Sequence, residues 1–452
     1  MESISATYSE FTTNTRFENL KPEVVSQTKK LILDLIGVSL AGYKLMEFPR
    51  MMVDYVTSLG GNPEATIIQT KKKFPAVNAA LANAACAHGI DMDDGHRFGA
   101  LHPGTVIIPA ALAATELSKA STKELIAGIV VGYEVMIRIG MAIVPSSLNR
   151  GFHITGITGP FGAAAAAANI LALSREETVG ALGMAGLQSS GLIQVNHEVE
   201  GAKVKPLNPA RAAMSGLFSC ILAKRGFQGP CSIFEGEDGF LKAVTDEVKH
   251  ELLTQNLGEE FEIQNVYLKL YAACRHAHAP IDAALLASAN SQMDVSAIEK
   301  IVVETYPAAV RLAGITHATS PSAGRFSIPF SVALALIRGD AGADKYSEEN
   351  IGDETIQRLA AKVQLSVGPK WERLYPQKRG ATLNIKGSNG KKWSAEVELA
   401  RGEPENPATW EEIYTKFRSN AAIVISDKDV ERLSEGIMNL ERASINDILD
   451  LI

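Results

Sequence analysis

Residues 88–104 read HGIDMDDGHRFGALHPG and hold three histidines and three aspartates within seventeen positions. Residues of these types together are typical of a metal centre, of a proton-transfer site, or of a polar loop that caps helices. The histidines are eight and six residues apart and are separated by glycines, whereas zinc sites have spacings such as HxxxH with a supporting carboxylate. The pattern therefore favours proton transfer, and the metal and capping alternatives stay open.

The local geometry of this stretch depends on how far the preceding alanine-rich helix runs. If the helix continues through the aspartates, His88 and Asp91 lie one turn apart on one face, and Asp94 continues that face. Asp93 then points elsewhere, the glycines that follow end the helix, and His102 with the next proline opens another helix. We therefore expect two polar helix ends to face each other across a short loop.

A second polar stretch, NRGFHITGITGPFGAAAAAA, has His153 alone among glycines and threonines. An isolated histidine is more often structural than catalytic, but glycine-rich turns allow a ligand to approach the backbone closely. We expect residues 159–162 to precede the N-terminus of an alanine-rich helix, where an anion could bind.

Two further polar stretches hold the remaining candidates. The stretch EGAKVKPLNPARAA carries Lys203, Lys205 and Arg211. The stretch KLYAACRHAHAPIDAAL carries Cys274, Arg275, His276 and His278. A run of cations that leads into a helix could hold a carboxylate, or it could be a solvated surface. The last stretch stands near a predicted domain boundary, where clefts form.

The elements that must position these side chains are helices over residues 1–265. The segment PEVVSQTKKLILDLIGVSLAG places its apolar residues on one helical stripe. Three later segments are rich in alanine, which favours helices and lets them approach closely. The segment SREETVGALGMAG begins with Ser174 and Glu177 at the spacing of a capping box. These patterns predict a packed helical bundle.

Beyond residue 265 the pattern becomes mixed. The segments EKIVVETY, KVQLSV, ATLNIKG and KKWSAEVELA read as strands, KGSNGKK predicts a hairpin turn, and SIPFSVALALIRGD reads as a helix. The last segments are again amphipathic helices, which we expect to pack back on the first ones. The predicted fold is mainly α with an α+β insertion: residues 1–265 and 403–452 form a large helical domain, and residues 266–402 form a smaller α+β domain.

The composition narrows the class of protein. The chain has 452 residues with a net charge of −7, which argues against general nucleic-acid binding. Four cysteines without a CxxC pair and no visible signal peptide predict a cytoplasmic protein with reduced thiols. Residues 125–144 are long and apolar enough to span a bilayer, but Glu134 and Arg138 can pair across one turn, so we expect a buried core helix and no membrane contact.

Together these stretches resemble the MmgE/PrpD family, which contains 2-methylcitrate dehydratase, cis-aconitate decarboxylase and iminodisuccinate epimerase. HGIDMDDGHRFGALHPG looks like the family's H-x-x-D-F-D-D…H-P-S/G stretch, and GFHITGITGPFGAAAAAA looks like its G-F/W-H…G-x-x-G-A-A-A-A segment. KVKPLNPARAA, KLYAACRHAHAPIDAA and GRFSIPFSVALALIRGD are similar to three later family motifs. The matches run in order over nearly the whole chain.

The resemblance implies a large helical domain, a smaller α+β lid with the active site between them, a homodimer, and neither cofactor nor metal. From the motifs we predict that the catalytic residues are Asp91, His102, His153, Lys205 and His278. We predict that a small carboxylate substrate is bound by Asp94, Lys203, Arg211, Cys274, Arg275 and His276.

The chain departs from the family pattern at three places. Gly95 stands where members of known activity often carry threonine or serine, and Asn208 stands where the pattern has histidine. Ala272 and Ala273 replace a proline and a serine. These changes alter the polar groups expected in the pocket and therefore bear on the identity of the substrate.

The leading hypothesis is a cofactor-independent lyase that dehydrates a small hydroxy acid such as 2-methylcitrate. In this reading His102 or His153, oriented by Asp91, moves the α proton, and Lys205 and Arg275 hold carboxylates. Decarboxylation or epimerisation through the same carbanion is the alternative within the family. From other classes, the open hypotheses are a non-catalytic polycarboxylate-binding protein and a metal-dependent hydrolase that uses His88, Asp91, Asp94 and His102.

Overall fold

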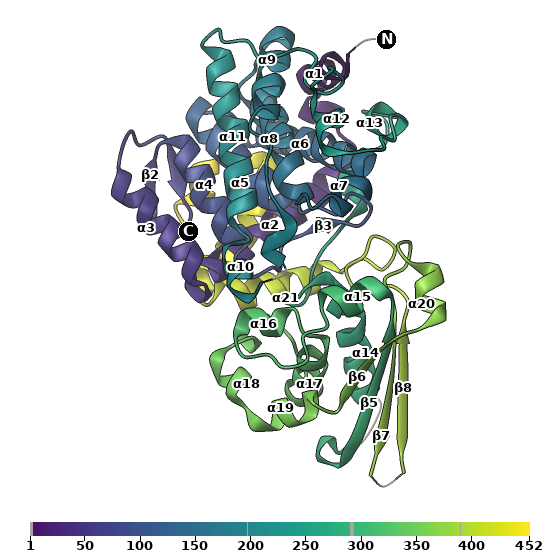
Figure 1. Cartoon of the computed structure of the whole chain (residues 1–452). Coiled ribbons are helices and arrows are strands. Elements are labelled where there is room, and N and C mark those ends of the chain that lie inside the picture. The colour runs from purple at the N-terminus through teal and green to yellow at the C-terminus, as the bar shows by residue number, and fades with distance from the viewer. Residues whose placement is uncertain (1–2, 197, 290–292, 389) are drawn as a thin grey trace. The chain divides into compact units, whose positions relative to one another are not determined.

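The computed structural model describes residues 3–196, 198–289, 293–388 and 390–452 (Figure 1). Helices make up 60% of the chain and strands 10%, which confirms a mainly α fold with a smaller α+β part. The contacts between residues divide the chain into two compact units. Unit 1 comprises Met1–Gly89, Asp93–Val266 and Ile413–Ile452, and unit 2 comprises Ile90–Met92 and Tyr267–Glu412. The main segment of unit 2 thus ends at Glu412, against the predicted end at residue 402.

Unit 1 is built almost entirely from helices. In chain order its elements are α1 (Ile4–Asn14), α2 (Pro22–Leu45), α3 (Glu47–Leu59), β1 (Ala65–Ile67), β2 (Lys72–Phe74), α4 (Ala76–Ala87), β3 (Gly95–His96), α5 (Gly104–Ser118), α6 (Thr122–Ile143), α7 (Ser146–Asn149), α8 (Ile154–Ile170), α9 (Arg175–Gly186), α10 (Val199–Val204), α11 (Leu207–Lys224), α12 (Phe240–Val244), α13 (Glu251–Thr254), α22 (Asp427–Met438) and α23 (Ile445–Leu449). Two elements lie where the residue ranges of the units meet, β4 (Val266–Tyr267) and α21 (Trp410–Ala421).

Small residues let the central helices of unit 1 pack closely. A Cβ atom on Gly162 of α8 would lie only 2.9 Å from the carbonyl oxygen of Gly132 in α6. A Cβ atom on Gly216 of α11 would lie 2.4 Å from the Cβ atom of Ala163 in α8. Neither space admits a larger side chain, so glycine is what allows these backbones to meet. The alanine-rich segments therefore form the bundle that the sequence predicts.

The C-terminal helices pack on the first helices of unit 1, as the amphipathic pattern predicts. α22 lies against α2. Lys416 of α21 forms a buried ion pair with Asp34 of α2, with Nζ and Oδ1 2.5 Å apart. Burial raises the pKa of the Asp34 carboxyl, and the nearby Lys416 ammonium opposes that effect. The pair joins the two ends of the chain within one unit.

The long apolar helix α6 is a core helix of unit 1. It is long and apolar enough to cross a membrane, yet its apolar window is wholly buried within the described part of the chain. Glu134 and Arg138 pair across one turn, with Oε2 and Nε 3.2 Å apart, as their spacing predicts. Burial raises the pKa of Glu134 to about 7. The two charges are therefore accommodated inside the bundle by their own pairing.

Unit 2 is built on a four-stranded sheet in the order β6-β5-β7-β8. β5 (Ile298–Thr305) runs parallel to β6 (Val363–Val367) and antiparallel to β7 (Ala381–Gly387), which pairs with β8 (Lys392–Val397). α14 (His278–Ala289) packs on β7 and β8 and against α17 (Ile328–Arg338) (Figure 1). The other helices are α15 (Pro307–Leu312), α16 (Pro321–Arg325), α18 (Glu348–Gly352), α19 (Glu354–Ala360) and α20 (Pro369–Leu374).

The strands of unit 2 follow the sequence pattern. Ala381, Leu383 and Ile385 of β7 are buried and alternate with more exposed residues, as in a strand that has one face covered. The antiparallel pairing of β7 with β8 confirms the hairpin that KGSNGKK predicts. Asn389, which belongs to that sequence motif, lies outside the described residues.

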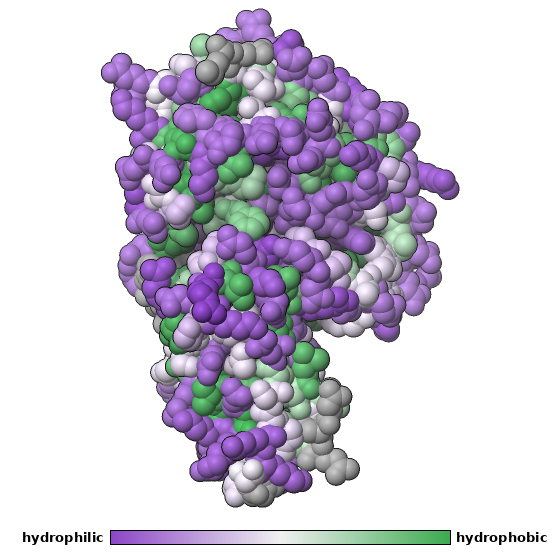
Figure 2. Space-filling view, turned by 90° about the vertical axis from the view of Figure 1, so that its right-hand side faces the viewer, coloured by the Kyte–Doolittle hydropathy of each residue, from purple (hydrophilic) through white to green (hydrophobic). Residues whose placement is uncertain are grey.

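The face of the molecule drawn in Figure 2 is mostly hydrophilic, and hydrophobic residues are scattered among the polar ones. This distribution is typical of helices that turn their apolar stripes inward.

Candidate active site

The polar stretch that follows α4 is a buried loop and not a continuing helix. α4 ends at Ala87, and His88 is its C-cap. Asp91 has a φ of 51°, in the left-handed region that residues other than glycine rarely adopt. The condition under which His88, Asp91 and Asp94 would share one helical face is therefore not met, because the chain turns before the aspartates.

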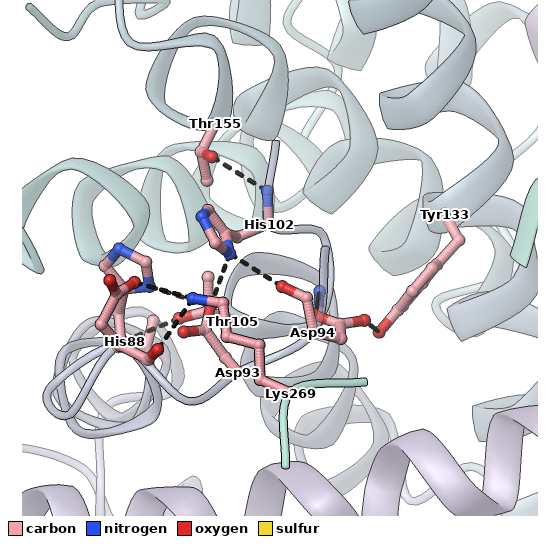
Figure 3. Close-up of polar contacts among 11 residues, drawn as sticks. His88, Asp93, Asp94, His102, Thr105, Tyr133, Thr155 and Lys269 are labelled. Atoms are coloured by element: carbon pink, nitrogen blue, oxygen red, sulfur yellow. Dashed lines mark hydrogen bonds and ion pairs between the residues drawn. The ribbon is translucent and has the colours of Figure 1, made fainter. Parts of the chain in front are cut away.

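This turn places His88, Asp93 and His102 side by side in unit 1 (Figure 3). His88 Nδ1 lies 2.9 Å from Asp93 Oδ2, and both side chains are fully buried. His102 Nδ1 lies 3.4 Å from the same carboxylate oxygen, and the two imidazole rings are 5.0 Å apart between centroids. Asp93, which would point elsewhere on a continuing helix, is therefore the carboxylate that lies beside His102.

The same three side chains are close enough to hold a metal ion, because one ligand atom from each lies within 4.8 Å of the others. His102 Nδ1, however, also lies 2.8 Å from the main-chain carbonyl oxygen of Asp94. A carbonyl oxygen only accepts, so this contact requires a proton on Nδ1 and leaves Nε2 as the ring nitrogen with a lone pair. The cluster also lacks Asp91 and Asp94, the two carboxylates that the hydrolase hypothesis named, because Asp91 is bonded to Lys269 and Asp94 to Tyr133.

Asp94, predicted to bind substrate, is bonded to two helices of unit 1. Its Oδ2 accepts a hydrogen bond from the Tyr133 hydroxyl of α6 at 2.7 Å (Figure 3). Its Oδ1 accepts from the backbone N–H of Gly104, the first residue of α5, at 2.9 Å. Burial raises the pKa of Asp94 to about 7. These contacts favour a capping role over contact with a substrate.

His153 is the N-cap of α8, which begins earlier than predicted. The helix runs from Ile154, so the glycines of GITGPFG lie inside it. A Cβ atom on Gly156 would lie 2.7 Å from the carbonyl oxygen of Ser190, so this glycine serves close chain packing. The prediction that residues 159–162 precede the helix N-terminus is therefore wrong.

The N-terminus of α8 lies next to His102. The backbone N–H of His102 donates to Thr155 Oγ1 at 3.0 Å, and Thr155 follows His153 by two residues (Figure 3). The His153 side chain is buried, with 4% of the residue exposed. Unit 1 thus brings two of the three histidines that were predicted to be catalytic, His102 and His153, to neighbouring backbone positions.

The predicted cationic loop contains one buried lysine. Lys205 lies between α10 and α11 and is buried, whereas Lys203 is exposed. Arg211 of α11 donates through Nη2 to the carbonyl oxygen of Gln188 at 2.8 Å and contacts the Ser190 hydroxyl. Burial lowers the pKa of Arg211. Of these three cations, the geometry favours Lys205 for a ligand and Arg211 for holding the turn after α9.

Asn208, which stands where the family pattern has histidine, lies against the turn that holds His153. The backbone N–H of His153 donates to the carbonyl oxygen of Gly191 at 3.1 Å. The Asn208 side chain lies close to both Gly191 and Gly156. Its amide nitrogen is buried and has no hydrogen-bond acceptor among the described residues. A buried donor of this kind costs free energy unless a ligand or water accepts from it.

In unit 2, Lys269 holds the turn at Asp91. Its Nζ donates to the main-chain carbonyl oxygen of Asp91 at 2.8 Å and to Oδ1 at 3.0 Å. Only 1% of the Lys269 side chain is exposed. The sequence prediction missed this residue. The sequence did contain a signal, which is a single lysine inside the apolar run VYLKLYAA. Such a run predicts burial, and a buried lysine is almost always paired, so a partner could have been expected.

Arg275 and His278 take part in a buried network within unit 2. Arg275 pairs with Glu403, with Nη2 and Oε1 2.9 Å apart. Its Nη1 lies 3.1 Å from His278 Nδ1, and His278 Nε2 lies 3.2 Å from the carbonyl oxygen of Ala273. Because arginine only donates, His278 accepts at Nδ1 and carries its proton on Nε2. The geometry favours structural roles for Arg275 and His278 over the predicted substrate binding and catalysis.

His276 and Cys274 lie at the same end of unit 2. His276 Nδ1 is 2.6 Å from the Tyr306 hydroxyl oxygen. Burial, with Arg379 among the nearby cations, lowers the pKa of His276 to about 3, so its ring is neutral near pH 7. Cys274 is half-buried, and its backbone N–H donates to the carbonyl oxygen of Arg325 at 2.8 Å. A neutral histidine can donate or accept a hydrogen bond but brings no charge to a carboxylate.

Comparison with known proteins identifies the family. Residues 6–253 match the MmgE/PrpD N-terminal domain, and residues 271–442 match the MmgE/PrpD C-terminal domain. The chain belongs to the MmgE/PrpD family. The family match confirms the resemblance that the motifs indicate.

Curated relatives of this MmgE/PrpD protein include two kinds of lyase. The chain is 27% identical to the cis-aconitate decarboxylase of Aspergillus terreus, over 97% of this chain and 94% of the relative. It is 25% identical to that of Homo sapiens, over 98% and 92%. It is 22% identical to the 2-methylcitrate dehydratase of Escherichia coli strain K12, over 93% and 91%.

Proposed function

We propose that the protein is a cofactor-independent lyase that transfers a proton at the carbon next to a carboxylate of a small di- or tricarboxylate. The observation that carries this proposal is the hydrogen bond that brings His102 next to the start of α8, where His153 is the N-cap. His102 lies 3.4 Å from the buried Asp93 carboxylate, and its backbone is bonded to Thr155 in the first turn of α8. Two histidines at neighbouring positions can serve as a base and an acid.

The chemistry requires charge stabilisation as well as a base. Removal of an α proton, or loss of CO₂, leaves an electron pair on the substrate next to a group that is already negative. Fixed cations stabilise that charge most effectively in a site that excludes water. Lys205, buried where α11 begins, is the residue that we assign to a substrate carboxylate. Lys269 and Asp91 are assigned to hold the turn that precedes Asp93.

Within this class we place decarboxylation of a cis-aconitate-like acid before dehydration of a 2-methylcitrate-like acid, which the motifs alone had placed first. The relatives named cis-aconitate decarboxylase are 27% and 25% identical to the chain, and the relative named 2-methylcitrate dehydratase is 22% identical. In decarboxylation, the electron pair of the broken C–C bond stays on the substrate carbon, CO₂ leaves, and a histidine donates a proton to that carbon.

The test is turnover of a defined substrate panel by the purified protein. We expect mass spectrometry to show CO₂ release from cis-aconitate, whereas loss of water from 2-methylcitrate would identify the second reaction. His102→Gln should lower kcat about 10²-fold, the usual scale for general acid–base catalysis. The matched control is His250→Gln, which changes an exposed histidine of the same unit and should keep full activity. A rise in melting temperature with polycarboxylates, without turnover of any of them, would replace the lyase proposal by the binding-protein hypothesis.

A further inference from the structure

We propose that Asp93 and His88 are positioning residues that fix the ring of His102 with its proton on Nδ1, so that Nε2 is the atom that exchanges a proton with the substrate. The inference rests on the proposed function in one respect, which is that His102 takes part in proton transfer. It adds which nitrogen of His102 reacts and which two buried side chains support that choice together with the Asp94 main-chain carbonyl.

The first step concerns the acceptors around His102 Nδ1. The Asp94 main-chain carbonyl oxygen lies 2.8 Å from this nitrogen, and Asp93 Oδ2 lies 3.4 Å from it. Both atoms accept hydrogen bonds and neither can donate when Asp93 is ionised. Nδ1 therefore keeps its proton whether the ring is neutral or charged. In the neutral ring the lone pair must then be on Nε2, because the partner of one ring nitrogen sets the state of the other.

The second step concerns the state of Asp93. The His88 ring contacts the same oxygen, with Nδ1 2.9 Å from Oδ2, and both side chains are fully buried. The other ring nitrogen of His88 is buried and has no hydrogen-bond partner among the described residues. A proton on that nitrogen would be a buried donor without an acceptor, which is costly, so His88 carries its proton on Nδ1 and donates it to Asp93. His88 thereby stabilises the carboxylate form of Asp93.

The third step concerns access. The side chains of His88 and Asp93 have no exposed area, whereas 16% of the His102 side chain is exposed. His102 is also held through its backbone, whose N–H donates to Thr155 Oγ1 at 3.0 Å (Figure 3). Of the three members of the cluster, His102 is therefore the one that a small molecule can reach. The other two act through it.

The proton transfer balances without a further reactant. When His102 acts as a base, the Nε2 lone pair takes the α proton, the C–H electron pair stays on the substrate carbon, and the Asp93 carboxylate stabilises the imidazolium that forms. When His102 acts as an acid, the Nε2 proton goes to the carbanion and the neutral ring returns. In both directions the proton on Nδ1 stays in place.

The experiment compares tautomers and kinetics in matched variants. In protein labelled with ¹⁵N-histidine, long-range ¹H–¹⁵N correlation spectra report which nitrogen of each neutral ring carries the proton. The chain has nine histidines, and the His102 signals are those that disappear in His102→Gln. We expect wild-type His102 to carry its proton on Nδ1, and Asp93→Asn to shift the population towards the Nε2 proton.

Steady-state kinetics of the same variants distinguish a positioning role of Asp93 and His88 from a role in substrate binding or in folding. We expect Asp93→Asn to lower kcat about 10²-fold and to change KM less than about threefold. His88→Ala, which leaves the carboxylate in place, should lower kcat about tenfold. The matched control is Glu134→Gln, which changes another buried carboxylate of unit 1, one that is paired with Arg138. It should lower the melting temperature but leave the His102 tautomer and kcat unchanged.

Three outcomes would overturn the proposal. The first is a wild-type His102 with its proton on Nε2. The second is an Asp93→Asn variant with wild-type tautomer and kcat. The third is a stoichiometric metal ion that shifts the His102 signals and is lost in Asp93→Asn, because the three side chains would then bind an ion. Full activity in His102→Gln would instead overturn the proposed role of His102 in turnover, and the tautomer spectra would still decide the positioning by Asp93.

Discussion

Lys269 provides the sharpest test of how the turn at Asp91 is held. Its ammonium group makes two hydrogen bonds to Asp91, one to the carbonyl oxygen and one to the carboxylate, and Lys269→Met removes both. Methionine is of similar length and carries no charge, so the variant leaves the Asp91 carboxylate in unit 2 without the Lys269 cation. We expect unit 2 to lose stability and the protein to lose turnover.

The size of this effect follows from the geometry. Unit charges 3.0 Å apart attract each other by roughly 5 kcal/mol at an effective dielectric constant of about 20. Desolvation offsets much of this attraction when the pair forms, but removing one partner of a buried pair still costs about 3–5 kcal/mol. The double variant Lys269→Met with Asp91→Asn removes both charges. We expect it to cost less than the sum of the two single changes.

Urea denaturation followed by tryptophan fluorescence measures the loss of unfolding free energy in unit 2, where Lys269 and Asp91 lie. Trp371, Trp393 and Trp410, the three tryptophans of the chain, all lie in unit 2. The control is Lys386→Met, which breaks an exposed pair with Glu299 on the same sheet and should leave the denaturation midpoint nearly unchanged. If Lys269→Met unfolds at the same urea concentration as this control, the account of the turn is refuted. If the double variant loses as much unfolding free energy as Lys269→Met and Asp91→Asn together, the direct pairing of Lys269 with Asp91 is refuted.

Three further predictions concern unit 1. Because burial raises the pKa of Asp94 to about 7, the folded protein holds this proton more tightly than the unfolded chain, and stability falls as the pH rises from about 4 to about 7. Asp94→Asn should remove from the unfolding free energy a pH dependence of roughly 4 kcal/mol, measured by circular dichroism in urea at pH 4 and pH 8. His153→Gln should lower kcat about 10²-fold with little change in melting temperature, and a near wild-type rate would move the site away from α8. Gly162→Ala would place a Cβ atom 2.6 Å from the Cβ atom of Met136 and should cost about 1–3 kcal/mol, whereas Gly352→Ala, with no atom within 4 Å of the new Cβ, should be nearly neutral by thermal denaturation.

Features that depend on residues within one helical turn could be predicted from the sequence. Ser174 and Glu177 form the capping box that their spacing predicts, with both reciprocal hydrogen bonds present. Glu134 and Arg138 form the predicted pair inside α6. In these cases the partner is fixed by helix geometry, so a local pattern is sufficient.

Features that depend on distant partners could not be predicted in the same way. The turn at Asp91 is bonded to Lys269, which is 178 residues away, and Arg275 is bonded to Glu403, which is 128 residues away. The pattern shows each charge but not the group that neutralises it. Arg275 was therefore predicted to face a substrate, although its guanidinium lies in a buried ion pair.

The glycines of α8 were misread for a related reason. GITGPFG contains three glycines and a proline, which locally favour a turn. In the structure Pro160 lies inside the helix, and the glycines face other parts of the bundle. Only the partners, such as Ser190 at Gly156 and Met136 at Gly162, explain why side chains are absent there.

The most direct test of the central claim is deuterium incorporation from D₂O during incubation with cis-aconitate. We predict that the product carries solvent deuterium at a carbon next to a carboxylate, as seen by NMR and mass spectrometry. His102→Gln should lower the rate of this incorporation about 10²-fold, and the exposed-residue control His250→Gln should not change it. Absence of both turnover and deuterium exchange with every polycarboxylate tried would contradict the claim that this protein transfers a proton at such a carbon.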